Sequence, residues 1–163
     1  MNRVVTGYDG NGNPAIIRHG EPPTVIRAGR YVTTELWVTD GTPRATGTDT
    51  STREWALEPP PGGSCFRIVE IAPGEDDGAA GAGGAAGDGA VLDAGHEGFQ
   101  DAHATDTLDY VTVLRGEVVL VVGGAEVTLG PGDSVIQQPG VPHDWQNRSA
   151  ERAVMIGVLL SAR

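Results

Sequence analysis

Residues 131–147 decide the fold, and their sequence is Pro131-Gly132-Asp133-Ser134-Val135-Ile136-Gln137-Gln138-Pro139-Gly140-Val141-Pro142-His143-Asp144-Trp145-Gln146-Asn147. The two Pro-Gly pairs are typical of turns, because proline presets one backbone angle and glycine tolerates a left-handed one. Ser134 to Gln138 lies between the turns and predicts a short strand. A return strand, Asp144 to Asn147, follows His143. The stretch therefore predicts turn, strand, turn and strand, with one histidine at the last junction.

A second informative stretch lies upstream and has the sequence His103-Ala104-Thr105-Asp106-Thr107-Leu108-Asp109-Tyr110. Every second residue of an extended segment faces the same side, so His103, Thr105 and Asp109 are expected on one face. A hairpin and a return strand would bring His143 to the same interior. Two imidazoles and one carboxylate would then converge, which is the ligand pattern of non-haem Fe(II) sites. Manganese, zinc and nickel are equally compatible with this ligand set.

The rest of the chain repeats short β-branched runs separated by glycine, proline, asparagine and aspartate, without helical periodicity. This pattern predicts an antiparallel all-β sandwich, jelly roll or barrel with almost no helix. The further strands are expected at Arg3–Thr6, Ala15–Arg18, Thr24–Ala28, Tyr31–Thr39, Ser64–Ala72, Leu108–Leu114, Val118–Val122, Ala125–Leu129 and Ala153–Leu160.

The 163 residues suit one domain, expected to extend over residues 1–163. We divide it into N-terminal strands (1–72), an acidic Gly/Ala-rich insertion (73–97) and a motif-bearing half (98–163). In residues 78–90, 12 of 13 positions are glycine or alanine. Such a tract has little side chain to bury. We therefore expect residues 74–95 to be flexible and dispensable for folding.

Composition excludes several functional classes. The net charge is −11, and all 11 basic residues are arginine, so lysine-dependent chemistry such as a pyridoxal phosphate Schiff base is excluded. The acidity argues against nucleic acid and anionic membranes as partners. Cys65 is the single cysteine, which excludes an intramolecular disulfide and a cysteine-cluster zinc site. The first residues hold no apolar run typical of a signal peptide, and we expect a cytoplasmic protein without a nucleotide cofactor.

The two stretches resemble the two motifs of the cupin superfamily, G-x5-H-x-H-x3,4-E-x6-G and P-G-x5-P-x-G-x2-H-x3-N. His103 and Asp109 fall on the first histidine and on the glutamate of the first motif, and Thr105 falls on its second histidine. Gln138 stands where the second motif has proline. Gly98 lies one residue away from the leading glycine of the first motif. The other positions that match the two motifs are Gly116, Pro131, Gly132, Gly140, His143 and Asn147. The resemblance implies a jelly-roll barrel with one divalent metal ion on His103, Asp109 and His143.

Two functions remain open at this point. The first is a metal-dependent isomerase, dehydratase, decarboxylase or dioxygenase that acts on a small aromatic or polyketide-like metabolite. The second is a ligand-binding or sensor barrel without metal. In either case the expected ligand contacts are Thr105, Tyr110, Gln138 and Trp145, although Tyr110 and Trp145 also suit core or rim packing. No catalytic residue is assigned. His19 and His96 are expected to be solvated, and His96 is a spare metal ligand.

We also expect a homodimer. Barrels of this kind expose sheet edges that need covering. The N-terminal hairpin, Arg3 to Arg18, is the element expected to pair with a partner subunit. Cupins commonly dimerise in this way.

Overall fold

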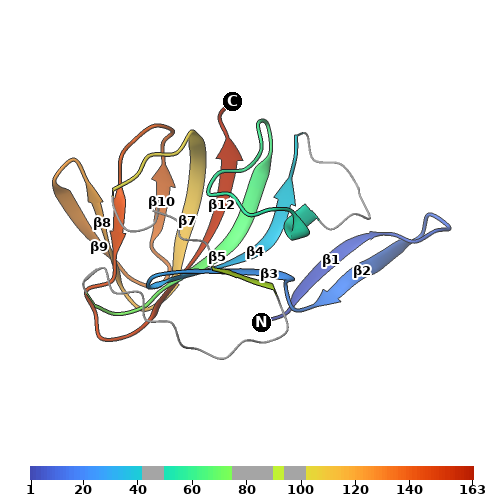
Figure 1. Ribbon diagram of the computed structural model, residues 1–163, viewed down its shortest axis with the longest axis horizontal. Helices are drawn as coiled ribbons and strands as arrows, with labels where there is room; N and C mark the ends of the chain where they lie inside the picture. The colour runs from blue at the N-terminus through green and yellow to red at the C-terminus, as the bar shows by residue number, and fades with distance from the viewer. Residues whose placement is uncertain (42–49, 75–89, 94–101) are drawn as a thin grey trace.

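The computed structural model describes residues 1–41, 50–74, 90–93 and 102–163 (Figure 1). These residues form twelve strands and one short 3-10 turn, η1 (Thr50–Thr52), which confirms the all-β prediction. No helix in this part of the chain is long and apolar enough to cross a membrane. The strands are β1 (Arg3–Tyr8), β2 (Pro14–Gly20), β3 (Thr24–Ala28), β4 (Tyr31–Thr39), β5 (Ser64–Ile71), β6 (Ala90–Asp93), β7 (Thr107–Arg115), β8 (Val118–Val122), β9 (Ala125–Leu129), β10 (Ser134–Gln137), β11 (Asp144–Gln146) and β12 (Ala153–Ser161).

The strands form a jelly-roll barrel built from two main sheets. The larger sheet has the order β10-β7-β12-β5-β4-β3-β6, and the smaller has the order β11-β8-β9. All pairings are antiparallel except that of β3 with β6. In Figure 1 the larger sheet crosses the molecule and the smaller one closes its left side. The predicted strands and the predicted antiparallel architecture are therefore confirmed.

Strand β6 lies where the sequence predicted a flexible insertion. Its four residues pair in parallel with Thr24 to Arg27 of β3. The expectation of flexibility over 74–95 is therefore wrong at 90–93, where an apolar Val-Leu pair follows the Gly/Ala tract. Residues 75–89 and 94–97 of the insertion, including His96, lie outside the described residues.

The hydrophobic core lies between the two sheets. Val118 and Leu120 of β8 are buried against residues of the larger sheet, including Val113 and Met155. Each fully buried apolar side chain of this size contributes roughly 1.5–3 kcal/mol. The core of the barrel also contains Ala28, Tyr31, Ile71, Leu129, Trp145 and Ala153.

Two of the motif residues have structural roles. Gly116 turns the chain between β7 and β8 with a φ of 74°, and a Cβ there would lie 2.8 Å from the Ala153 Cα atom. Asn147 is fully buried, and its Nδ2 donates to the carbonyl oxygens of Ile71 and Glu151 at 2.9 and 2.7 Å. Its Oδ1 accepts from the Ser149 amide at 3.0 Å. Both residues fix turns, and neither lines the barrel pocket described below.

Strand β4 changes its inward face at a bulge between Glu35 and Trp37. Before the bulge Tyr31 and Glu35 are buried, and after it Val38 is buried beside Cys65. In a regular strand, which has a period of two, Val32, Leu36 and Val38 would share one face. The inserted residue breaks that period. The bulge therefore places Glu35 inside the barrel.

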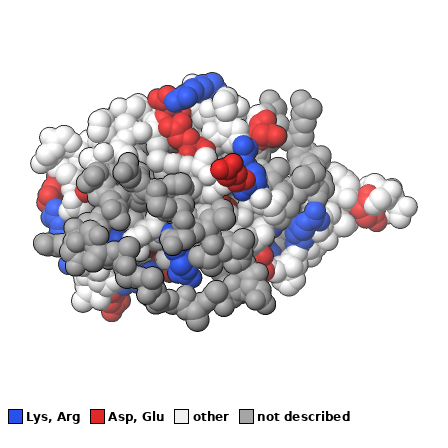
Figure 2. All heavy atoms as spheres, in the orientation of Figure 1, with Lys and Arg blue, Asp and Glu red and all other residues white. Residues whose placement is uncertain are grey.

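The hairpin β1–β2 forms a separate two-stranded sheet that extends beyond the barrel (Figure 1). One face carries the exposed side chains of Val4, Tyr8 and Ile16. On the face of the molecule shown in Figure 2, acidic and basic side chains lie beside one another. An exposed apolar hairpin face is compatible with a dimer contact, and the homodimer stays a prediction.

Candidate functional site

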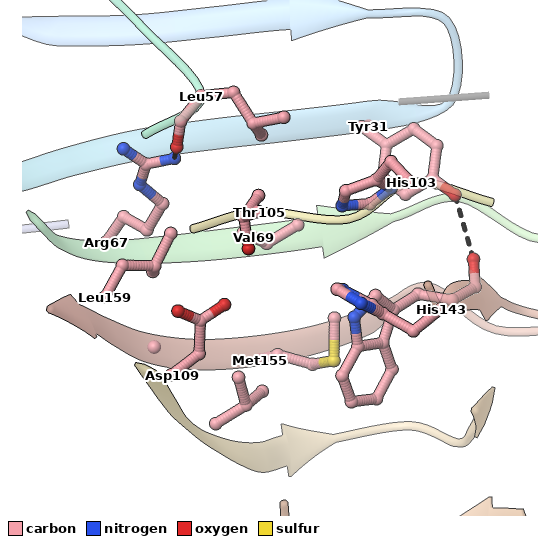
Figure 3. Close-up of a pocket in the computed structure, with 13 residues that line it drawn as sticks. Tyr31, Leu57, Arg67, Val69, His103, Thr105, Asp109, His143, Met155 and Leu159 are labelled. Carbon is pink, nitrogen blue, oxygen red and sulfur yellow. Dashed lines mark hydrogen bonds between the residues drawn. The ribbon is translucent and has the colours of Figure 1, made fainter. Parts of the chain in front are cut away.

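A cavity of about 80 Å³ lies inside the barrel (Figure 3). Its wall combines apolar side chains with two groups of polar ones. We call His103 and His143 the histidine end, and Asp109, Thr105 and Arg67 the carboxylate end. In Figure 3 the two histidines lie on the right, Arg67 and Asp109 lie on the left, and Thr105 lies between them. The remaining lining residues are Tyr31, Leu57, Val69, Val111, Trp145, Met155, Gly157 and Leu159.

A pair of backbone hydrogen bonds positions the histidine end. The His103 amide donates to the His143 carbonyl at 3.0 Å, and the His143 amide donates to the His103 carbonyl at 2.9 Å. Residues that exchange both bonds in an antiparallel pair project their side chains to the same side. The two imidazole rings accordingly lie with their centroids 4.6 Å apart. The sequence prediction that the two histidines meet inside the barrel agrees with this geometry.

The tautomer of His143 follows from its surroundings. The ring is buried, and its Nδ1 lies 3.0 Å from the Val141 carbonyl oxygen. A carbonyl oxygen only accepts, so Nδ1 carries a proton, and Nε2 has a lone pair whenever the ring is in its neutral form. Trp145 packs edge-on against this ring, with centroids 6.3 Å apart. His143 can therefore offer Nε2 to a ligand as a hydrogen-bond acceptor or base.

Asp109 lies on β7, whose alternate side chains face the pocket. The residue is only 6% exposed, and its carboxylate is directed into the pocket (Figure 3). Its Oδ1 atom has no hydrogen-bond partner among residues 1–41, 50–74 and 102–163. Burial raises the pKa of this carboxyl, and a hydrogen bond from Thr107 and the charge of His143 oppose the rise. An unpartnered buried oxygen is costly, so it marks a place where a ligand atom would be favoured.

Arg67 reaches the pocket from β5 and is held by a buried ion pair. Its Nε lies 2.6 Å from Glu35 Oε1, and both side chains are at most 5% exposed. The guanidinium also donates to the Leu57 carbonyl at 2.9 Å and to the Ala56 carbonyl at 3.3 Å. Burial raises the pKa of the Glu35 carboxyl, and Arg67 opposes that rise. Arg67 is thus a fixed charge in the wall, already neutralised by Glu35.

Sequence analysis missed Arg67, Glu35 and Tyr31. Arg67 could have been predicted to face inward, because side chains alternate along a strand and Arg67 is an even number of residues from the buried Cys65 and Ile71 of β5. No comparable signal existed for Glu35, since the bulge in β4 is not visible in the sequence. Tyr31 packs in the wall, and its hydroxyl donates to the Trp145 carbonyl at 2.8 Å.

The four expected ligand contacts divide into two groups. Thr105 and Trp145 line the cavity, and their contact with a ligand stays a prediction. Tyr110 is 45% exposed and Gln138 is also exposed, and neither lines the cavity. Tyr110 follows Asp109 in the strand and so faces the opposite side. Gln137, not Gln138, is buried, and its Nε2 donates to the Val141 carbonyl at 3.2 Å. Tyr110 and Gln138 therefore lie outside the wall of this cavity, and their contact with a ligand stays a prediction.

The predicted three-ligand metal site is not assembled. Within the described ranges, no three histidine, cysteine, aspartate or glutamate side chains group closely enough to hold one ion. Protein zinc sites use at least three protein ligands. The two imidazoles supply two, and Asp109 lies at the other end of the pocket. The side chains that the structure describes therefore do not fit a resident ion on His103, Asp109 and His143.

Comparison with known proteins places residues 90–159 in the family described as "Cupin domain". "Phomopsin biosynthesis cluster protein C'" and "Phomopsin biosynthesis cluster protein D", both of Diaporthe leptostromiformis, are each 33% identical over 89 residues, which are 55% of this chain and 35% of theirs. The chain thus spans about a third of the length of these relatives.

Solved structures give weaker similarities. A Cupin 2 conserved barrel domain protein from Salinispora arenicola is 17% identical with a TM-score of 0.48, covering 81% of this chain and 76% of that chain. A cupin superfamily protein from Desulfitobacterium hafniense is 12% identical with a TM-score of 0.47, covering 83% of this chain and 81% of that chain.

Proposed function

We propose that the barrel pocket binds a small organic molecule without a resident metal ion, starting from the match of residues 90–159 to the cupin domain family. The observation that carries this proposal is the enclosed cavity, whose wall is mainly apolar and has polar groups at two ends. Small-molecule sites typically combine an apolar lining with a few placed polar groups. A cavity of about 80 Å³ accepts a small ligand or a protruding part of a larger one.

The ligand we propose is an aromatic or polyketide-like metabolite. Two relatives are named as proteins of a phomopsin biosynthesis cluster, which associates them with the making of a metabolite. In this chain Trp145 and Tyr31 offer aromatic surface, and Met155 is polarizable and adapts to irregular shapes. His143 Nε2 is the pocket atom suited to accept a proton from such a ligand.

A screen of small aromatic fragments by two-dimensional NMR would test the proposal. We expect binding fragments to shift the indole N–H signal of Trp145, which lines the pocket. The Trp37 indole is the matched control, because Trp37 lies in a separate groove beside the N-terminal strand. Shifts at Trp37 without shifts at Trp145, or no saturable shift with any fragment, would contradict binding in the barrel.

A metal-dependent enzyme is the second candidate, favoured by the close approach of the two imidazoles. It needs a third ligand from outside the described residues or from the bound molecule. Elemental analysis of protein purified without a tag separates the two functions, and we expect less than one metal ion per chain. One tightly bound ion that is lost in His143→Ala would establish the second candidate. Its affinity would then fall as pH drops through the histidine range, because protons compete for the same lone pairs.

A further inference from the structure

We propose that Asp109 forms a hydroxyl-recognition subsite at the carboxylate end, and that Gly157 keeps the space in front of it open. This inference rests on the proposed function, because it names the ligand group that the pocket selects. It predicts a small neutral ligand that is apolar apart from a hydroxyl group facing Asp109.

The first step concerns the empty hydrogen-bonding position on Asp109. The side chain is more than nine-tenths buried and lines the cavity, and its Oδ1 lacks a partner among the described residues. Burying an acceptor oxygen without a hydrogen bond costs free energy. A ligand that donates a hydrogen bond to Oδ1 would remove this cost.

The second step concerns the room beside Asp109. Gly157 lies on β12 opposite Arg67 on one side and opposite Val111 on the other. Its neighbours on the same face, Met155 and Leu159, project into the pocket, whereas position 157 has no side chain. A Cβ there would lie 3.7 Å from its nearest neighbours, the Leu159 and Val111 side chains, which is ordinary van der Waals contact. The space is therefore open, and alanine fits it without strain.

The third step selects the donor by charge. Arg67 and Glu35 neutralise each other, and a ligand ammonium would have to give up its hydration to enter this buried and mainly apolar pocket. A ligand carboxylate would add a negative charge beside Asp109 and Glu35. A neutral hydroxyl avoids both costs, since it donates to Oδ1 and brings no charge into a buried site.

The test compares phenol with toluene, which have the same shape and differ in one hydroxyl. We expect titration calorimetry to show phenol binding about tenfold tighter, the effect of one buried hydrogen bond. The Trp145 indole signal reports that binding occurs in the pocket. Aniline, with an amine in place of the hydroxyl, should bind more weakly than phenol.

Variants assign the preference to named residues. Asp109→Leu should bind the two probes equally, and Asp109→Asn should keep part of the preference, because an amide oxygen still accepts. Gly157→Ala should weaken both probes by filling the space. Glu117→Leu removes an exposed acid outside the pocket, and it should bind like the unaltered protein.

The outcomes separate the two proposals. Equal binding of phenol and toluene by the unaltered protein, a preference that survives Asp109→Leu, or tighter binding of aniline would each overturn the hydroxyl subsite and leave the ligand-binding pocket standing. If neither phenol nor toluene shifts the Trp145 signal, the subsite is overturned for its simplest ligands. If in addition no fragment of the wider screen shifts that signal, the proposed function fails as well.

Discussion

The two polar ends of the pocket are built in different ways. The histidine end joins two loop segments through an isolated backbone pair, and His103 is only half-buried. At the carboxylate end, Asp109 and Arg67 lie on the continuous strands β7 and β5, and Arg67 stands in register between Glu35 of β4 and Gly157 of β12. The difference indicates that the sheet fixes one end, while the loops leave the other freer to adjust to a ligand. The following predictions probe that contrast.

The largest effect is expected at the buried ion pair. Glu35→Ala leaves the Arg67 charge buried without its partner, which should lower the free energy of unfolding by about 3–5 kcal/mol. Urea denaturation at pH 7 measures the loss. A second variant, Glu35→Gln with Arg67→Met, removes both charges and should recover much of it. A loss below about 1 kcal/mol in Glu35→Ala would show that the sheet end is not held by this pair.

A smaller loss is expected at the histidine end. His143→Ala removes a buried ring and one of the two donors to the Val141 carbonyl, the other being Gln137 Nε2, so stability should fall by about 1–2 kcal/mol. The same denaturation experiment compares the two ends directly. A loss as large as that of Glu35→Ala would break the contrast between a fixed and an adjustable end.

Removing the charge of Asp109 is expected to stabilise the protein. The folded-state pKa of this carboxyl is raised above its ordinary value of 3.8, so the folded protein holds a proton that the unfolded chain has already lost. Stability therefore falls as pH rises from the ordinary value through the raised one. Asp109→Asn should lose this part of the pH dependence and be more stable than the unaltered protein at pH 7. Melting temperatures between pH 3 and 8 check the sign, and a variant that is less stable at pH 7 would contradict it.

The smallest effect is expected at the surface. Arg148 and Glu126 form an exposed pair at 2.7 Å, and exposed pairs contribute little because water screens them. Glu126→Gln should therefore leave the denaturation midpoint unchanged within error. A clear shift would show that distance, not burial, sets the value of ion pairs in this fold.

The sequence predicted the barrel well because strands and turns depend on local residues. β-branched runs, Pro-Gly turns and the alternation of His103, Thr105 and Asp109 are visible without a structure. The carboxylate end was less predictable, because it depends on which strands become neighbours. Arg67 meets Glu35 across an antiparallel pair whose register shifts at a bulge, and no short-range pattern specifies that bulge.

The three predicted metal ligands are not grouped in the described part of the chain, for a related reason. The alternation of side chains correctly placed Asp109 on the inner face of the barrel. Alternation does not, however, give the distance between Asp109 and the two histidines. Asp109 pairs with Gln137 on β10, whereas His103 pairs with His143 beyond the end of that strand. Residues that share the inner face therefore need not lie close enough together to bind one ion.

The reciprocal backbone bonds between His103 and His143 have a consequence for how the protein folds. They join positions that are 40 residues apart in the sequence. Closing so long a loop is entropically unfavourable until the intervening hairpins of β7 to β10 have shortened it. The two imidazoles should therefore meet late in folding, after the sheets have formed. A partly folded chain would then have a collapsed barrel before it has a competent pocket.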